Sequence, residues 1–148
     1  LSFQRGKEIA LFIRKTLRRI MYYVTDTHSL VWYFTSDPRL SSKALSAFSE
    51  AESDGNIIVP AVVLAEIMFI AKKGRITISF AETLDKIGES GNFIIAPLDA
   101  DILKIADKIE ADLEMHDKLI AATAIYYEAV LITRDENLSR SQIVTTVW

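Results

Sequence analysis

Hydrophobic residues gather in short runs along positions 21–148, and these runs alternate with longer segments in which apolar positions follow a helical period. The runs are rich in β-branched and aromatic residues. They predict buried strands over 22–25, 56–59, 93–96 and 130–133, with a weaker fifth strand over 143–147. Because the strands are short and nearly all apolar, we expect both faces of their sheet to be covered.

Helices are predicted between these strands, from Ser41 or Ser42 to about 52, over 61–72, from Ser79 to about 87, over 100–113 and over 117–127. Ser79 with Glu82 fits a capping box, and Gly74 is placed to end the helix over 61–72. Strands that alternate with helices need crossover connections, which give a parallel sheet. The predicted fold is therefore a three-layer α/β/α sandwich with a mainly parallel central sheet.

Residues 1–20 form a basic, amphipathic extension before a single domain over 21–148. The extension carries six Lys or Arg against one Glu, a balance of +5, so the net charge of −3 leaves −8 on the remainder. Its apolar residues have a near-helical spacing: Ile9, Phe12, Ile13, Leu17 and Ile20. We expect this helix to cover apolar surface on the domain or on a neighbouring protomer, with one of its basic residues near acidic groups. The alternative is that the natural chain starts at Met21.

Composition excludes several classes of protein. The chain has 148 residues, 50% of them hydrophobic, and a small net charge, which argues against disorder. With no cysteine, it has neither disulfides nor thiolate zinc sites. No apolar run approaches the roughly 18 residues of a membrane-spanning helix. We therefore expect a soluble, cytoplasmic domain.

Four acidic residues fall at positions where a parallel sheet would bring them together. Asp26 follows the first strand, and Asp135 lies two residues beyond the fourth. Asp117 begins the helix that leads into the fourth strand, and Glu66 interrupts an apolar helix. Carboxylates crowded into one pocket repel one another unless cations are bound, and oxygen ligands favour Mg²⁺ or Mn²⁺. Such an ion activates water and stabilises phosphoryl charge, which favours phosphodiester hydrolysis.

Each of these residues also has a structural interpretation. Asp26 could cap the helix after the first strand, and Asp117 could be the N-cap of its own helix. Asp135 could be a loop residue, and Thr133 with Glu136 matches a capping box. Glu66 is the hardest to explain structurally, because a carboxylate on an apolar helix face is costly unless it is paired or bound to metal.

Four segments together resemble the signature segments of PIN domains, and the greatest likeness is to the VapC toxins of toxin–antitoxin pairs. They are VTDTHSLVW at 24–32, VPAVVLAEI at 59–67, HDKLIAATA at 116–124 and LITRD at 131–135. The resemblance extends over 21–148, and the ordered set is more specific than any one segment. Residues 1–20 have no counterpart in a minimal PIN domain.

This resemblance implies a Mg²⁺-dependent endoribonuclease that acts on RNA, with Mn²⁺ as a substitute cation. It implies an acidic metal site made of Asp26, Glu66, Asp117 and Asp135, with Thr133 as the supporting hydroxyl. It also implies a homodimer and inhibition by a cognate antitoxin whose tail occupies the active-site groove.

Two other functions remain open at this stage. One is a PIN-like binding module without catalytic activity, which the presence of all four acids argues against. The other is a phosphorylation-responsive receiver domain. A receiver needs paired acids after its first strand and an acceptor Asp after a central one. Here Asp26 stands alone, and the third strand ends in Ala96 and Pro97.

Histidine and aromatic residues near these acids have a structural and a functional interpretation. His28 and His116 stand next to Asp26 and Asp117, but ordinary hydrogen-bonded histidines are the favoured interpretation. The aromatic run 32–34 could stack on a base, but packing in the core or in a dimer is favoured.

Overall fold

A computed structural model describes the backbone of residues 2–148 and the side-chain surroundings of residues 4–13 and 22–148. Five parallel strands form one sheet in the order β3-β2-β1-β4-β5. Their bounds are Tyr22–Thr25 (β1), Asn56–Pro60 (β2), Phe93–Ala96 (β3), Val130–Ile132 (β4) and Thr146–Val147 (β5). The predicted parallel sheet is therefore confirmed.

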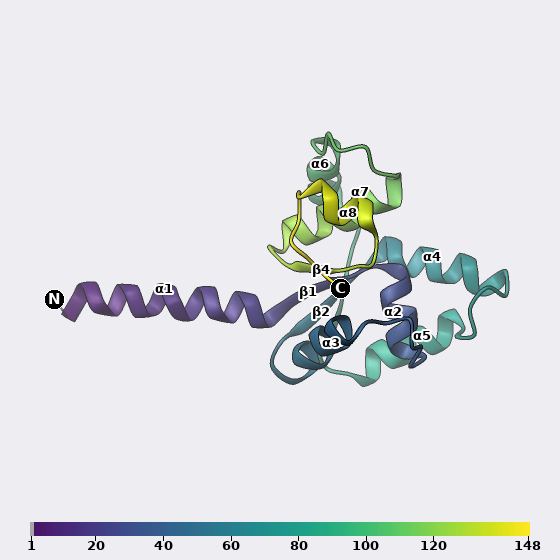
Figure 1. Ribbon diagram of the computed structural model, residues 1–148, viewed down its shortest axis with the longest axis horizontal. Coiled ribbons are helices and arrows are strands. Elements are labelled where there is room, and N and C mark those ends of the chain that lie inside the picture. Colours follow the sequence, from purple (N-terminus) through teal and green to yellow (C-terminus); the bar gives the residue numbers. More distant parts are fainter. Residues whose placement is uncertain (1) are drawn as a thin grey trace.

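Helices cover both faces of this sheet, so the predicted three-layer α/β/α sandwich is confirmed. Figure 1 shows α6, α7 and α8 on one side of the strands and α2, α3 and α5 on the other. The helices are Ser2–Met21 (α1), Thr27–Phe34 (α2), Ser42–Asp54 (α3), Ala61–Lys72 (α4), Phe80–Glu89 (α5), Ala100–Asp107 (α6), Met115–Tyr126 (α7) and Glu136–Ser141 (α8). None of the helices in the described part of the chain is both long and apolar enough to cross a membrane.

Side-chain caps fix where several helices begin. In each case an Asp or Ser oxygen accepts a hydrogen bond from the backbone N–H three residues later. The capping residues are Asp26 for α2, Ser41 for α3, Ser79 for α5, Asp99 for α6 and Asp135 for α8. At the other end of α4, Gly74 adopts a φ of 69°, a left-handed conformation that suits glycine.

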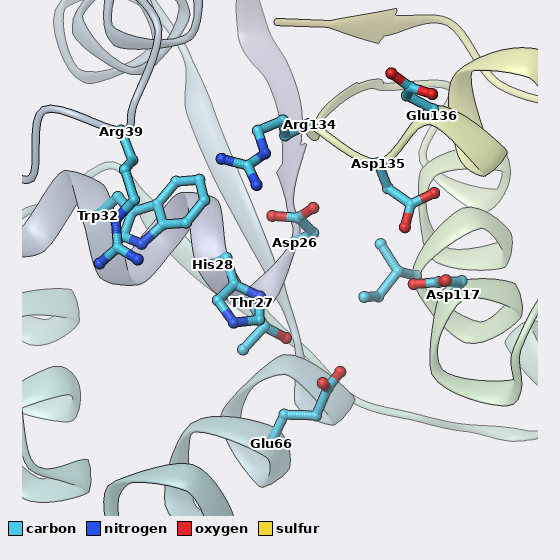
Figure 2. Close-up of a pocket in the computed structure, with 11 residues that line it drawn as sticks. Asp26, Thr27, His28, Trp32, Arg39, Glu66, Asp117, Arg134, Asp135 and Glu136 are labelled. Atoms are coloured by element: carbon cyan, nitrogen blue, oxygen red, sulfur yellow. The ribbon is translucent and has the colours of Figure 1, made fainter. Parts of the chain in front are cut away.

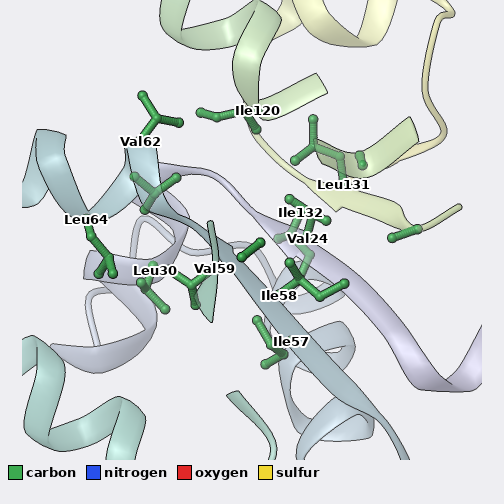
Figure 3. Packing of buried hydrophobic residues seen from close by; sticks show 14 of the residues in the cluster. Val24, Leu30, Ile57, Ile58, Val59, Val62, Leu64, Ile120, Leu131 and Ile132 are labelled. Atoms are coloured by element: carbon green, nitrogen blue, oxygen red, sulfur yellow. The ribbon is translucent and has the colours of Figure 1, made fainter. Parts of the chain in front are cut away.

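The core lies between the sheet and its two helical layers. Val24, Ile58 and Ile132 from three adjacent strands are fully buried, and Figure 3 shows them beside Leu131 and Ile120. Burial of this set explains why the strands contain almost no polar residues. The same packing fixes the strand ends from which the candidate site is built.

Four elements differ from the sequence prediction. Helix α6 ends at Asp107 rather than at 113, because the N–H groups of Lys108 and Ile109 bond to carbonyls three residues back and tighten the last turn. Helix α7 begins at Met115, two residues earlier than predicted. Strand β5 is confined to its last two predicted positions, and the polar helix α8 was not predicted.

The predicted N-terminal helix exists, but its apolar face does not lie on the domain. Ile9, Phe12 and Ile13 are 52%, 69% and 49% exposed, so these three residues do not cover the domain. Packing of the helix on a neighbouring protomer stays a prediction. The reason is that α1 ends at Met21 and β1 begins at the next residue, which leaves no turn to fold the helix back. Figure 1 shows α1 extending away from the sheet. Leu17, Ile20 and the basic residues at 14, 15, 18 and 19 lie outside the described side chains.

Candidate active site

The four predicted carboxylates line one pocket at the carboxyl edge of the sheet. The pocket has a volume of about 820 Å³ and contains Asp26, Glu66, Asp117 and Asp135 in its wall. Figure 2 shows these side chains reaching the pocket from separate elements. Sheet order explains the location, because the order of the parallel strands reverses between β1 and β4, and this switch point leaves a crevice at their carboxyl ends.

Asp26 has both a structural role and a position in the pocket. Its backbone N–H donates to the Ile132 carbonyl of β4 at 3.3 Å, which continues the pairing of β1 with β4. Its Oδ1 accepts from the Ser29 N–H at 2.9 Å, so the alternative that Asp26 caps a helix is confirmed. The second oxygen, Oδ2, accepts the Thr133 hydroxyl at 2.5 Å. Two donors thus hold this carboxylate in one orientation.

Thr133 connects two of the carboxylates and does not form the capping box that its sequence allows. Its hydroxyl donates to Asp26 and accepts from the Asp135 N–H at 3.0 Å. The N-cap of α8 is instead Asp135, whose Oδ1 accepts from the Leu138 N–H at 3.0 Å. Because Thr133 is fully buried, this link is shielded from water. It fixes Asp26 relative to the residue that begins α8.

Asp117 lies in the first turn of α7, where the N-cap position belongs to Glu114. The alternative that Asp117 is itself the N-cap is therefore wrong. The pKa of Asp117 is raised from 3.8 to about 6, first by burial and then by the negative charges of Asp135, Glu114, Asp26 and Glu66. These carboxylates therefore interact electrostatically, although their segments are far apart in the sequence.

Glu66 extends from α4 into the pocket next to an unpaired hydroxyl. Burial raises the pKa of Glu66, and the nearby Thr27 hydroxyl and His116 oppose that rise. Among the buried side-chain nitrogen and oxygen atoms of the described residues, Thr27 Oγ1 is the one without a hydrogen bond of normal geometry, although it is close enough to Glu66 to affect its pKa. Figure 2 shows Thr27 facing the pocket between His28 and Glu66. An orphaned buried hydroxyl beside carboxylates is a suitable polar group for a bound ion's water or a substrate oxygen.

The two histidines differ in their surroundings. His116 Nδ1 lies 2.5 Å from Glu114 Oε1, and this pairing raises the pKa of His116 and lowers that of Glu114. The hydrogen-bonded interpretation of His116 is therefore confirmed. His28 is exposed on the pocket wall, with its ring 5.7 Å from that of Trp32.

The aromatic run pairs with other rings, as the favoured interpretation predicted. Trp32 is 6% exposed, and Tyr33 stacks on Phe48 with ring centroids 4.2 Å apart. Phe34 lies 5.2 Å from Phe93, also measured between centroids. Stacking of Trp32 on an RNA base is therefore excluded in this conformation, because its faces are covered.

The donor types in the pocket fit a hard divalent cation. Carboxylate oxygens are the ligands that Mg²⁺ and Mn²⁺ prefer. The pKa of Asp117 is raised first by burial and then by the neighbouring carboxylates, whose repulsion a cation would relieve. Among the described residues, no three acidic or histidine side chains are close enough together to surround one ion. Mutual repulsion favours this separation, so we expect cation binding to draw the carboxylates inward.

Sequence reasoning missed five residues of the pocket wall: Thr27, Arg39, Ile120, Arg134 and Glu136. Arg134 had a usable signal, because it stands between Thr133 and Asp135. Arg39 had none, since it reaches the pocket from the loop after α2, and that path depends on how the loop packs.

Comparison with known proteins gives one family match. The model of the PIN domain family matches residues 23–143. No curated protein matches the chain.

Several solved structures share the fold at low sequence identity. VapBC2 from Rickettsia felis, bound to a DNA fragment from its promoter, aligns with a TM-score of 0.65 and 18% identity, covering 86% of this chain and 98% of that chain. A toxin–antitoxin complex from Klebsiella pneumoniae aligns with a TM-score of 0.59 and 23% identity, over 84% and 96% of the two chains. VapC20 from Mycobacterium tuberculosis, a sarcin–ricin-loop-cleaving toxin, aligns with a TM-score of 0.61 and 15% identity, over 82% and 96%.

Proposed function

Because this chain belongs to the PIN domain family, we propose that it is a divalent-cation-dependent endoribonuclease and the toxin of a toxin–antitoxin pair. The observation that carries the proposal is the meeting of Asp26, Glu66, Asp117 and Asp135 in one pocket at the crevice between β1 and β4. VapC proteins with this domain are nucleases, and the similar VapC20 is a sarcin–ricin-loop-cleaving toxin.

In the proposed site, Asp26, Asp117 and Asp135 would hold Mg²⁺ or Mn²⁺, directly or through water, and Glu66 would hold a second ion or orient the attacking water. The bound cation supplies a lowered water pKa and neutralises charge that develops on the phosphoryl group. Thr133 fixes the Asp26 carboxylate, and Thr27 offers an unpaired hydroxyl beside Glu66. Hydrolysis in line with the leaving oxygen needs no covalent intermediate.

The two other candidate functions have less support. A receiver of the usual type has the strand order 2-1-3-4-5, whereas this sheet has the order 3-2-1-4-5. An inactive binding module has no need for a carboxyl group whose pKa is raised to about 6, and perturbed groups of this kind gather at reactive sites.

We further propose a cognate antitoxin, a homodimer and a cytoplasmic location. A solved toxin–antitoxin complex among the similar structures supports a protein partner. The acidic pocket is open to solvent, which leaves room for a basic segment of such a partner. The proposed substrate, RNA, supports a cytoplasmic location.

The decisive experiment maps cleavage ends in total cellular RNA after brief induction of the protein. The intact protein should produce new ends at defined positions, and Asp26→Asn should produce none. If both proteins yield the same ends, cleavage comes from another nuclease and the proposal is wrong.

Removing the Thr133 hydroxyl should weaken both the fold and the reaction. Thr133→Val keeps the side-chain shape but leaves the part-buried Asp135 N–H without its acceptor, which should cost about 1 kcal/mol of unfolding free energy. Cleavage should fall because Asp26 loses its second donor. Thr133→Ser should restore most of the stability and most of the cleavage rate. Denaturant unfolding will measure the first, and initial rates of cleavage will measure the second. A Val variant with wild-type activity would contradict the positioning role.

Removing residues 1–20 should leave the reaction unchanged. All residues of the pocket wall lie between 26 and 136, and α1 extends away from the sheet. We therefore expect a chain that starts at Met21 to cleave RNA at the rate of the full chain. Initial rates at several salt concentrations test this, and a higher rate for the shorter chain at low salt would show that the extension shields the pocket.

A further inference from the structure

Two arginines and a tryptophan form a basic wall on one side of the acidic pocket. Figure 2 shows Arg39, Trp32 and Arg134 together, with Asp117 and Asp135 across the pocket from Trp32. Arg39 comes from the loop after α2, and Arg134 lies between Thr133 and Asp135. No catalytic role in the proposed site needs either guanidinium group.

Trp32 orients both guanidinium groups. The Cζ atoms of Arg39 and Arg134 lie 4.9 and 5.1 Å from the centre of its ring, within the range of cation–π attraction. The indole of Trp32 is almost fully buried, and it packs edge to face on Trp148 with the two ring centroids 5.8 Å apart. It is therefore a fixed support, and the arginines stacked on it are held near the pocket rather than free in solvent.

The two arginines differ in their remaining binding capacity. Arg39 donates to both oxygens of Asp37, at 3.1 and 2.8 Å, and this pairing lowers the pKa of Asp37 to about 2. Arg134 is exposed, and within the described part of the chain it forms no ion pair. Its guanidinium therefore keeps hydrogen-bond donors and a positive charge for a ligand, in a pocket that also contains several carboxylates.

We propose that Arg134, supported by Trp32, binds an RNA phosphate adjacent to the phosphodiester that is cleaved. The inference rests on the proposed nuclease function. A planar guanidinium matches two phosphate oxygens at once, whereas the indole is too buried to stack on a base. Arg134 follows Thr133 and precedes Asp135, so a phosphate bound there is placed beside the carboxylates. The arginine also offsets part of the repulsion between RNA and the acidic pocket.

Binding of a labelled single-stranded RNA tests this in an Asp117→Asn background, where the RNA is not cut. Arg134→Gln should weaken binding about tenfold or more, since a charge-assisted contact is lost. The slope of log K against log salt should fall by about 0.7, the value for one phosphate contact on a single strand. Arg134→Lys should keep the slope but recover only part of the affinity, because it lacks the planar fork.

Two further variants separate the local contact from a general charge effect. Lys43→Gln removes one positive charge from α3, beside a different pocket, and should leave RNA affinity unchanged. Trp32→Phe keeps a smaller ring and should lower affinity less than Arg134→Gln, with the salt slope intact. In the cleaving protein, Arg134→Gln should raise KM more than it lowers kcat, as expected for a residue that binds a neighbouring phosphate equally in the ground state and in the transition state.

The outcomes distinguish this inference from the proposed function. If the intact protein cleaves RNA but Arg134→Gln binds it as tightly as the control, the phosphate site is wrong and the nuclease is not. If the intact protein neither binds nor cleaves RNA, the proposed function fails first. If Arg134→Gln leaves RNA affinity unchanged and weakens only a purified acidic peptide or partner, the residue serves a protein partner and the inference is overturned.

Discussion

Asp26→Asn and Asp117→Asn should each lower RNA cleavage by about 10³-fold or more, because each removes a charge on which the proposed cation site depends. Both proteins should still fold. Asn caps a helix as well as Asp does, so the Ser29 N–H keeps its acceptor in Asp26→Asn. Asp117→Asn removes like-charge repulsion, so the cation-free protein should melt at the same temperature or higher. Initial rates and thermal melts measure both effects.

Helix α6 provides matched controls for these two variants. Asp99 caps α6 through the Ile102 N–H at 3.1 Å, as Asp26 caps α2, but lies outside the pocket. Asp101 occupies the first turn of α6, as Asp117 occupies the first turn of α7. Asp99→Asn and Asp101→Asn should therefore leave cleavage unchanged. Equal losses in all four variants would indicate a general charge effect and would remove the case for a local site.

The strands and the meeting of the acids were predictable because both follow from strong, short-range rules. The runs at 22–25 and 93–96 match β1 and β3 at both ends, since Asp26 follows the first run and Asn92 and Pro97 flank the second. Once the sheet is parallel, residues after β1 and β4 must meet at one edge, and this places Asp26 near Asp135. The sequence pattern alone was sufficient for that step.

Other features depend on packing that a sequence pattern does not record. Helix α8 is polar apart from Leu138, so it lacks an apolar period and was not predicted. The role of Thr133 was misassigned in one alternative because the capping box competes with a partner 107 residues away, and the distant partner prevails. The wall formed by Arg39 and Arg134 depends on Trp32 and on its contact with Trp148 near the other end of the chain.

Divalent cations should stabilise the protein, and the effect should depend on pH through Asp117. A cation that binds only the folded state at about 100 times its Kd adds about 2.7 kcal/mol, a rise of about 5–10 °C in Tm at this length. Removing it with a chelator should abolish cleavage, and Mg²⁺ or Mn²⁺ should restore it. Glu66→Gln should reduce the rise in Tm. Thermal melts with K⁺ at matched ionic strength separate binding from screening.

The sign of the pH effect follows from the raised pKa of Asp117, which moves from 3.8 to about 6 on folding. Between these two values the folded protein holds a proton that the unfolded chain releases, so stability without cations should fall as pH rises through this window and level off above it. Cations compete with that proton, so the rise in Tm should be small near about pH 5 and full at about pH 8. Asp117→Asn should lose both trends, whereas Asp101→Asn should keep them. A rise in Tm that is independent of pH in the intact protein would place the cation away from Asp117.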